Sequence, residues 1–266
     1  MAEVHATAIV DPQARFGTGV RIGPYCVVGA RVELGEQVVL HSHVVVEGRT
    51  QVGARTQIYP FASIGHRPQD MKFRGEPSEL IVGMDNTIRE HVTMNPGTEG
   101  GGMVTRIGDR CLFMMGAHVA HDCRIGDRVI LANNATLGGH VIIEEGAIIG
   151  GLSAVHQFVR IGRHAMVGGM SGVEHDIIPY GMATGERARL QGLNVIGMKR
   201  HGFARADIQA LSEAYAVLFG RGHTLAERVE RVAREFGESA GVAEIVDFVR
   251  ADSSRALCRP RAENGD

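Results

Sequence analysis

Large apolar residues recur at every sixth position along most of this chain. Beginning at Val4, eleven consecutive members of the series are large and apolar, an event expected about once in ten thousand random trials at a hydrophobic content of 44%. The members are Val4, Val10, Phe16, Ile22, Val28, Leu34, Leu40, Val46, Val52, Ile58 and Ile64. The series returns in the same register for three members from Val82, and then runs, one residue out of step, from Ile107 to Val173. A sixfold repeat of this kind predicts a parallel β-helix.

Each six-residue unit is expected to form one short strand and one turn. Three units close one triangular coil, and the large apolar side chains fill the interior of the prism that the coils build. Glycine often follows the apolar residue, as at Gly17, Gly23 and Gly29, and glycine or asparagine at a corner accepts a positive φ. Because paired strands lie about 4.8 Å apart, nearly nine coils predict a prism roughly 40 Å tall. The period alone does not give the hand of the coil.

Two interruptions of the repeat predict loops that leave the prism. Residues 66–80 are charged and contain two prolines, and residues 95–106 are rich in glycine. Loops on a rigid scaffold commonly carry binding functions, so both segments are candidates for part of a site. An insertion without a function is the alternative for each loop.

The C-terminal part of the chain changes to a helical period after about residue 200. The segment ARADIQALSEAYAVLFGRG predicts a helix with an apolar face made by Ile208, Leu211, Tyr215, Leu218 and Phe219. A second helix is expected after Thr224, which is a candidate N-cap with Glu227 at the capping-box position. GVAEIVDFVRADSS is a third amphipathic segment. The sequence therefore predicts a repeat domain over residues 1–185 and a small helical domain over residues 186–266.

Composition and charge exclude several classes of protein. The chain has 28 Lys and Arg against 30 Asp and Glu, a net charge of −2, which argues against binding nucleic acid or a membrane surface through bulk charge. No apolar run is long enough for a membrane span, and the first residues lack the pattern of a signal peptide. The four cysteines form no CxxC pair. Free thiols indicate a reducing compartment, so we expect a cytoplasmic protein.

Residues that lie one coil apart stack in columns along the prism, and this stacking brings several histidines together. Gly139 falls directly over His121, which removes a side chain there and leaves a backbone N–H beside the imidazole. Asp122 and His140 share the neighbouring column. Four histidines within three coils fit two chemistries: a general base near neutral pH, or a metal site of three imidazoles. A structural ladder of histidines that hydrogen-bond between coils is the alternative without a catalytic role. The four histidines are His118, His121, His140 and His156.

Small residues fill two further neighbouring columns. The first contains Ala132, Gly150 and Gly168, and the second contains Asn133, Gly151 and Gly169. A strip of the prism without side chains is suited to a linear ligand. It is equally suited to a close contact between subunits, and the spacing does not separate these alternatives.

Several motifs match one known family over almost the whole chain. They are QDMKFRGEPSEL, GGGMVTRIG, GAHVAHDCRIGDRVILANNATLGGHV, GGLSAVHQFVRIG, VGGMSGV and LNVIGMKRHGF. With them the chain resembles the UDP-N-acetylglucosamine acyltransferases, which catalyse the first step of lipid A biosynthesis. The resemblance implies a left-handed parallel β-helix with C-terminal helices, assembled as a homotrimer with sites between subunits. It implies transfer of a 3-hydroxyacyl chain from acyl carrier protein to the 3-hydroxyl of UDP-N-acetylglucosamine.

The resemblance also implies roles for particular residues. His121 would be the general base, Asp122 would orient its imidazole, and the Gly139 N–H would face the thioester oxyanion. No cofactor and no metal ion are implied. The residues expected to bind substrate are Gln69, Asp70, Lys72, His118, Asn133, Asn134, His140, His156, Gln157, Gly169, Asn194 and Arg200. Two departures from many relatives, Pro96 and Arg187, concern the second loop and the nucleotide end.

The length of the acyl chain is expected to depend on Gly169. In the family, the residue at this position stops the chain, and glycine presents no side chain, so we expect a long donor of about fourteen carbons. The flexible side chain of Met170 is the feature that would shorten it. Candidates for docking the acidic carrier protein are Arg160, Arg163, Arg200 and Arg205, for each of which a solvated surface position is the alternative.

Three other functions remain as alternatives. A trimeric β-helix carbonic anhydrase also clusters histidines, but around zinc, and it needs neither the QDMK loop nor a helical tail. Another hexapeptide-repeat acyltransferase is the second alternative. The later N-acyltransferase of the pathway is expected to have a domain before its repeats, whereas here they begin at Val4. A scaffold protein would need none of the histidines for activity.

Overall fold

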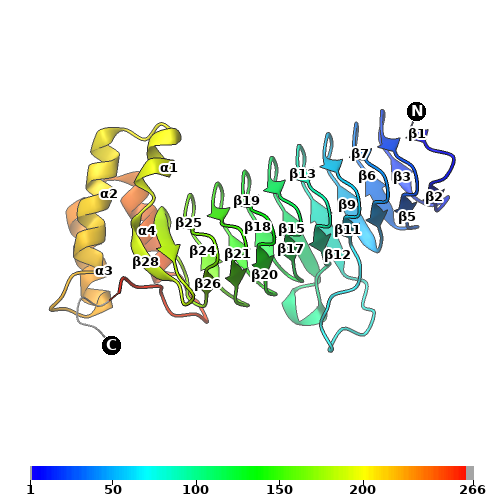
Figure 1. Cartoon of the computed structure of the whole chain (residues 1–266). Helices are drawn as coiled ribbons and strands as arrows, with labels where there is room; N and C mark the ends of the chain where they lie inside the picture. The colour runs from blue at the N-terminus through cyan, green and yellow to red at the C-terminus, as the bar shows by residue number, and fades with distance from the viewer. Residues whose placement is uncertain (1, 262–266) are drawn as a thin grey trace.

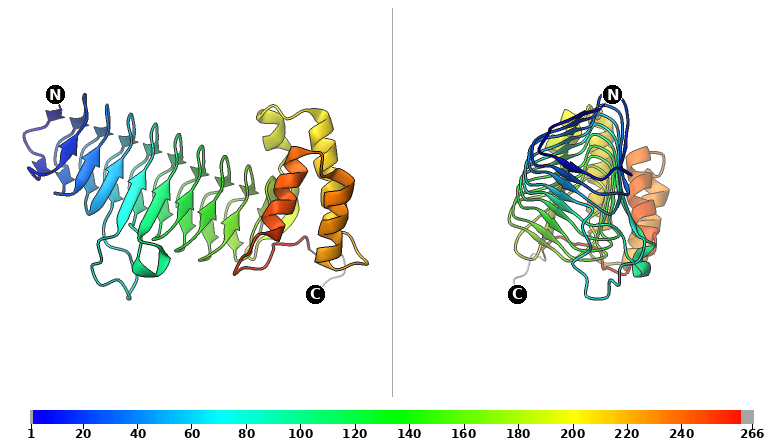
Figure 2. Two further views of the ribbon diagram at one scale, coloured as in Figure 1. Left: turned by 180° about the vertical axis from the view of Figure 1, so that it is seen from behind. Right: turned by 90° about the vertical axis from the view of Figure 1, so that its right-hand side faces the viewer.

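The structure, a computed structural model, describes residues 2–261 and shows a long parallel β-helix followed by helices (Figure 1). The strands form three sheets, which are the three faces of a prism. Within a face, each regular strand pairs in parallel with the strand one coil further along the chain, as Ile130 pairs with Ile148. Viewed along its length, the prism is triangular, with the helices beside one end (Figure 2). The predicted repeat architecture is thereby confirmed.

The three sheets contain eleven, nine and eight strands within the described residues. The first sheet contains β1 (Glu3–Val4), β4 (Arg21–Ile22), β7 (Val39–Leu40), β10 (Gln57–Ile58), β13 (Thr87–Ile88), β16 (Leu112–Phe113), β19 (Ile130–Leu131), β22 (Ile148–Ile149), β25 (Met166–Val167), β27 (Gly181–Thr184) and β28 (Arg189–Leu193). The second contains β2 (Ile9–Val10), β5 (Val27–Val28), β8 (Val45–Val46), β11 (Ser63–Ile64), β14 (Thr93–Met94), β17 (His118–Val119), β20 (Thr136–Leu137), β23 (Ala154–Val155) and β26 (Gly172–Val173). The third contains β3 (Arg15–Phe16), β6 (Val32–Leu34), β9 (Arg49–Val52), β12 (Glu79–Val82), β15 (Val104–Ile107), β18 (Arg124–Ile125), β21 (Ile142–Ile143) and β24 (Arg160–Ile161).

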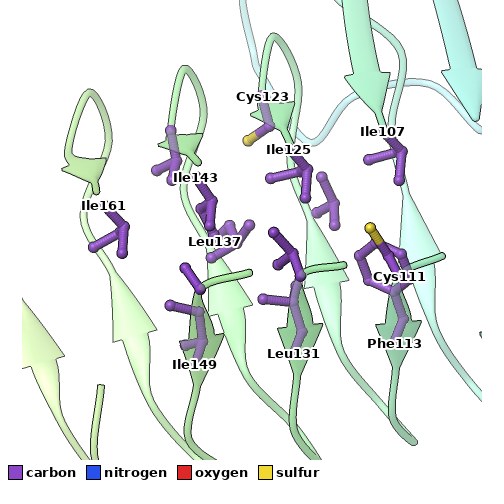
Figure 3. Close-up of a cluster of buried hydrophobic side chains, with 14 of the residues drawn as sticks. Ile107, Cys111, Phe113, Cys123, Ile125, Leu131, Leu137, Ile143, Ile149 and Ile161 are labelled. Carbon is purple, nitrogen blue, oxygen red and sulfur yellow. The ribbon is translucent and has the colours of Figure 1, made fainter. Parts of the chain in front are cut away.

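The apolar series fills the interior of the prism, as its period predicts. Phe113, Leu131 and Ile149 are fully buried, and Figure 3 shows the corresponding side chains of successive coils pointing toward one another. Val4, the first member of the series, is an exception, because 47% of it is exposed. Val4 belongs to the first described coil, whose strands pair with another coil on one side only within residues 2–261.

The residues with positive φ at the corners of the prism are mostly of other types than expected, since the sequence predicts glycine and asparagine there. The left-handed residue of a turn is more often another type, including Phe61 (φ 65°), Asp122 (φ 61°) and His140 (φ 61°). Each such residue costs on the order of 1 kcal/mol. The conformation allows the backbone N–H of the turn to reach the coil below, as His140 N does in donating to His121 O at 2.9 Å. The repeated hydrogen bond offsets the backbone strain.

We number the corners by the sheets that they join. Corner 1 joins the first and second sheets, corner 2 the second and third, and corner 3 the third and first. Their turns in the upper coils include Asn133–Asn134 at corner 1, His121–Asp122 at corner 2 and Arg163–His164 at corner 3. Both predicted loops leave the prism at corner 2, between β11 and β12 and between β14 and β15 (Figures 1 and 2). The second loop contains the 3-10 helix η1 (Glu99–Gly101).

Four helices follow the strands: α1 (Val195–Arg200), α2 (Arg205–Leu218), α3 (Leu225–Phe236) and α4 (Ala240–Arg250). The last three match the predicted helices, and the capping box between Thr224 and Glu227 is present. The hairpin β27–β28 and the short helix α1 were not predicted, because they carry neither the sixfold nor a sustained helical period. No helix within residues 2–261 is both long and apolar enough to cross a membrane.

Two of the proposed docking arginines hold the helices against the prism. Arg160 donates to Asp176 at 2.7 Å and lies over the ring of Phe248 at 4.4 Å. Arg163 pairs with Glu244 at 3.2 Å. Arg160 and Arg163 therefore contact α4, and docking of the carrier protein by any of the four arginines stays a prediction.

His164 is buried where the helices pack against the prism, and its burial should make the stability of the protein depend on pH. It lines a pocket of about 540 Å³ with Arg128, Arg163, Tyr180 and Glu244, among others, and its ring lies 4.5 Å from that of His201. Burial, followed by the charges of His201 and Arg163, lowers the pKa of His164 to about 4. The folded protein therefore binds fewer protons than the unfolded chain between about pH 6.5 and about pH 4, so its free energy of unfolding falls as the pH falls through this window.

The substitution His164→Asn tests this contribution, because asparagine tolerates the left-handed backbone at this turn. We expect the variant to lose less stability than the wild type between about pH 6.5 and about pH 4 in denaturant titrations. An unchanged pH dependence would show that His164 contributes nothing to it.

Candidate active site

His121 and Asp122 occupy the turn that follows β17 at corner 2. The Nδ1 atom of His121 lies 2.8 Å from Oδ2 of Asp122, and the Asp122 side chain is completely buried. Thr98, in the second loop, donates its hydroxyl to the same carboxylate oxygen at 2.6 Å and its backbone N–H to Oδ1 at 2.9 Å. Thr105 accepts the backbone N–H of Asp122 at 2.8 Å. The second loop thus fixes the carboxylate from two sides.

These hydrogen bonds set the charge of Asp122. Burial alone raises the pKa of Asp122, but hydrogen bonds from His121 and Thr98 outweigh it, so the pKa lies below its ordinary value. An ionised carboxylate beside Nδ1 places the proton of the neutral imidazole on Nδ1. The other ring nitrogen, Nε2, is then an acceptor. A neutral imidazole oriented in this way is suited to removing a proton from a bound hydroxyl.

Gly139 lies directly over the imidazole, as the stacking of columns predicts. A Cβ atom at this position would lie 2.5 Å from Cε1 and 2.6 Å from Nε2 of His121, so only glycine fits. The Gly139 N–H has no hydrogen-bond partner among the residues of the described chain. A free donor beside the acceptor nitrogen can stabilise an oxygen that becomes negative during acyl transfer.

Two further histidines adjoin the pair. His140 meets the His121 ring edge-on at a centroid distance of 5.0 Å and stacks on Phe158 at 4.4 Å. His118 lies on β17, which leads into this turn, with Nδ1 2.7 Å from the hydroxyl of Thr93. Burial lowers the pKa of both histidines, so both are neutral near pH 7. They offer polar contacts to a ligand without adding charge.

The three-imidazole metal hypothesis does not match this geometry. The group whose ligand atoms lie within 4.8 Å of one another consists of His121, Asp122 and His140, and it does not include His118. Oδ2 of Asp122 already accepts hydrogen bonds from His121 and Thr98. A metal ion at this carboxylate would have to displace them.

The first loop and the next coil extend the group along corner 2. The charge of Asp70 acts on His140, and Asp70 accepts the backbone N–H of Lys72 at 2.9 Å, while Gln69 and Lys72 are exposed. One coil above Gly139, His156 and Gln157 continue the same corner, where Phe158 N donates to Gly139 O at 3.1 Å. One chain therefore brings together most of the predicted site residues. They are Gln69, Asp70, Lys72, His118, His121, Asp122, Gly139, His140, His156 and Gln157.

The other predicted residues lie elsewhere on the prism. Asn133, Asn134 and Gly169 are at corner 1. This corner precedes the strands of the second sheet, whereas corner 2, with His121, follows them. Asn194 is at corner 3, where its amide donates to His164 O at 3.1 Å and accepts from Gly197 N at 3.0 Å as the N-cap of α1. Arg200 ends α1. These residues do not meet His121 within one chain.

Two residues of this region were not found from the sequence. Thr98 holds Asp122, and Arg255 donates to His156 and to Gln157. Thr98 is 24 positions from its partner, and Arg255 is almost one hundred positions away. Neither lies in the sixfold repeat, so the columns give no signal for them.

Comparison with known proteins relates this site to one enzyme family. Residues 176–258 match the family model described as UDP N-acetylglucosamine O-acyltransferase, domain 2, and residues 105–139 match that of bacterial transferase hexapeptide repeats. The acyl-[acyl-carrier-protein]–UDP-N-acetylglucosamine O-acyltransferase of Methylobacterium radiotolerans is 57% identical over 204 residues, which are 77% of this chain and 75% of the relative. The protein of the same name from Bartonella henselae is 46% identical over 261 residues, which are 98% and 95% of the two chains.

A solved structure extends the comparison to the fold. A crystal structure of UDP-N-acetylglucosamine acyltransferase, 44% identical in sequence, superposes with a TM-score of 0.94 over 98% of this chain and 100% of its own. The likeness confirms the predicted left-handed parallel β-helix with C-terminal helices.

Proposed function

The chain belongs to the acyl-[acyl-carrier-protein]–UDP-N-acetylglucosamine O-acyltransferases, and we propose that it performs their reaction with His121 as the general base. It is an O-acyltransferase that moves an acyl chain from acyl carrier protein to UDP-N-acetylglucosamine in lipid A biosynthesis. The assignment of the base rests on one observation: Nδ1 of His121 is bonded to the carboxylate of Asp122, and Gly139, without a side chain, lies directly over the imidazole.

The reaction then proceeds by direct attack of the sugar on the thioester. Nε2 of His121 takes the proton of the 3-hydroxyl as its oxygen bonds to the acyl carbonyl carbon. Asp122 stabilises the imidazolium that forms, and the Gly139 N–H donates to the oxyanion, a contact worth about 3 kcal/mol of barrier. The tetrahedral intermediate breaks its bond to sulfur, and the proton passes from His121 to the departing thiol of the carrier. The products are the sugar ester and free carrier protein.

Substrate binding is shared between corners in this proposal. Gln69, Asp70 and Lys72 of the first loop bind the sugar and the hydroxyl of a 3-hydroxyacyl chain, with His118, His140, His156 and Gln157 around them. Asn194 and Arg200 bind the nucleotide, although they lie at another corner of the same chain. A homotrimer, in which a neighbouring copy supplies that corner, reconciles the two positions. The division near residue 185 then separates the prism that carries the base from a part that carries the nucleotide site.

We further propose a cytoplasmic location. The four cysteines are buried and free, as expected in a reducing compartment. The carrier protein and the nucleotide sugar would be met there as diffusing substrates.

Removal of the Thr98 hydroxyl should weaken catalysis while leaving the fold intact. Thr98→Val keeps the backbone hydrogen bond to Asp122 but loses the hydroxyl at 2.6 Å. A hydrogen bond to a charged group is worth about 1.5 kcal/mol or more, so we expect kcat to fall about tenfold. Thr98→Ser should restore most of the rate. Equal rates for the valine and serine variants would exclude this role of the hydroxyl.

Filling the strip at corner 1 should shorten the acyl chain that is accepted. Gly151 and Gly169 stack directly, since a Cβ atom on Gly169 would lie 3.2 Å from Gly151 O, and neither presents a side chain. Each buried methylene contributes about 0.8 kcal/mol, so an open strip favours a donor of about fourteen carbons. Gly169→Met should shift the preference toward donors of about ten carbons. Competition between acyl carrier proteins of different chain length measures the shift, and an unchanged preference would contradict it.

An acyl-transfer assay tests the proposed function directly. Purified protein, UDP-N-acetylglucosamine and 3-hydroxyacyl carrier proteins of several chain lengths should yield a singly O-acylated sugar nucleotide in mass spectra. Absence of this product from folded protein with every donor would refute the proposal. Stoichiometric zinc together with hydration of carbon dioxide would favour a carbonic anhydrase instead.

A further inference from the structure

The C-terminal segment returns to the prism after α4 and passes beside corner 2. The structure places it along the last coils, with β-bridges from Asp176 to Leu257 and from Leu190 to Pro260 (Figure 1). Cys258 is buried, and its N–H donates to Asp176 O at 2.8 Å. These contacts fix the position of Arg255, three residues earlier in the segment.

The Arg255 guanidinium binds the turn one coil above Gly139. Nε donates to Gln157 O at 2.9 Å, and Nη2 lies 2.7 Å from Nδ1 of His156. A guanidinium has donors only, so Nδ1 of His156 is the acceptor in this contact. Nδ1 also lies 3.3 Å from Gln157 O, but the shorter contact with Arg255 decides its role, and Gln157 O accepts from Nε of Arg255 instead. The proton of the neutral imidazole is then on Nε2, on the opposite side of the ring. Arg255 therefore turns the exposed His156 into a hydrogen-bond donor.

The charge of Arg255 is not neutralised within the described part of the chain. Other arginines of this part of the molecule pair with carboxylates, as Arg160 does with Asp176 and Arg250 with Glu230. Arg255 has no such ion pair within residues 2–261, and its only side-chain contacts recorded there are neutral groups of His156 and Gln157. A half-buried, positioned guanidinium without an acidic partner is suited to an anionic ligand, above all to a phosphate.

The position of this group relative to His121 suggests which anion it meets. Gln157 is two coils above His121 in the same column, and coils repeat at about 4.8 Å, so the group lies about 10 Å along corner 2 from the base. UDP-N-acetylglucosamine carries its diphosphate on the same sugar ring as the hydroxyl that is attacked. A diphosphate within this distance of the base would meet both the Nε2–H of His156 and the remaining guanidinium N–H groups.

We propose that Arg255 is a positioning and specificity residue for the acceptor substrate. It holds His156 as a donor and adds a fixed positive charge at the diphosphate of the nucleotide sugar. This inference rests on the proposed function, because the acceptor identifies the anion. The C-terminal segment is then part of the active site as well as a clasp on the prism.

The test compares Arg255→Gln with a matched arginine on the helices. Arg255→Gln should raise the KM for UDP-N-acetylglucosamine about tenfold and change kcat and the KM for the acyl carrier protein less than about threefold. Arg250→Gln, which breaks an exposed ion pair with Glu230, should leave all three constants unchanged. A fall in kcat alone, or equal effects of the two substitutions, would overturn the proposal.

Two further measurements separate positioning from general loss of structure. Nitrogen chemical shifts should show His156 protonated on Nε2 in the wild type and a mixture of tautomers in Arg255→Gln. Isothermal titration with UDP should show weaker binding to Arg255→Gln, and Arg255→Lys should recover the charge but not the tautomer. Unchanged UDP binding and an unchanged tautomer in Arg255→Gln would overturn the proposal. If the wild type shows no acyl transfer but Arg255→Gln still binds UDP more weakly than the wild type does, this site stands and the proposed function alone is refuted.

Discussion

The variant His121→Ala should turn over at least about 100-fold more slowly than the wild type, the scale of lost general-base catalysis. The physical reason is the loss of Nε2 of His121, whose ring is oriented by Asp122 through Nδ1 and lies directly beneath Gly139. The KM values for both substrates should change little, because the imidazole acts on the proton in the transition state. Steady-state kinetics with saturating acyl carrier protein measures the effect.

A matched histidine substitution gives the control for this experiment. His223→Ala removes an exposed imidazole near α3, far along the chain from corner 2, and should leave turnover unchanged. The melting temperature and the oligomeric state of His121→Ala should match those of the wild type. Near-normal turnover in a folded His121→Ala protein would show that another group is the base.

The second large effect is expected from a single methyl group. In Gly139→Ala the new Cβ atom would lie 2.5 Å from Cε1 of His121, closer than van der Waals contact allows. The imidazole is buried and bonded to Asp122, so it must leave its catalytic position to relieve the overlap. Alanine keeps the backbone N–H, and the loss of rate therefore reports the displaced ring. We expect kcat to fall at least about 100-fold.

Gly29→Ala is the corresponding control at a corner of a lower coil. A Cβ atom there would be 3.5 Å from its nearest neighbour, an ordinary contact, so activity should be retained. A crystal structure of Gly139→Ala should show the His121 ring rotated away from Asp122. If the variant keeps wild-type activity, the ring is not held as tightly as its hydrogen bond to Asp122 implies.

The regular repeat explains which parts of the site could be predicted from the sequence. Between Ile107 and Val173 no residue interrupts the period. Once the period has predicted a β-helix with coils of three units, counting forward by one coil places Gly139 over His121 without any coordinates. The same counting places Gly169 over Gly151 at another corner. Periodicity fails at the ends of the solenoid, where Val4 lacks a coil beneath it and the chain leaves the repeat for β27, β28 and α1.

Contacts made by irregular segments could not be predicted in this way. Thr98 reaches Asp122 because a glycine-rich loop folds back over the turn, and a Cβ atom on Gly101 would overlap the Asp122 carboxylate. Arg255 reaches His156 only after the helices have returned the chain to the prism. Nothing in local composition fixes where such segments end. For Asn194, the sequence motif indicates a role in binding, but the single chain shows it capping a helix at another corner.

Within the described residues the first coil pairs with another coil on one side only, which has a consequence for how local unfolding spreads through the molecule. Each coil of a solenoid is stabilised by the coils above and below it, and the first coil, with Val4 and Ile9 exposed, has a neighbour on one side only. Thermal fraying therefore starts at this end and loses probability with every coil that it must cross. The turn of His121 lies several coils inside that boundary, and the helices close the other end. Local melting of the lower coils therefore leaves the geometry of the site undisturbed, and catalysis requires this geometry to be held within about 0.5 Å.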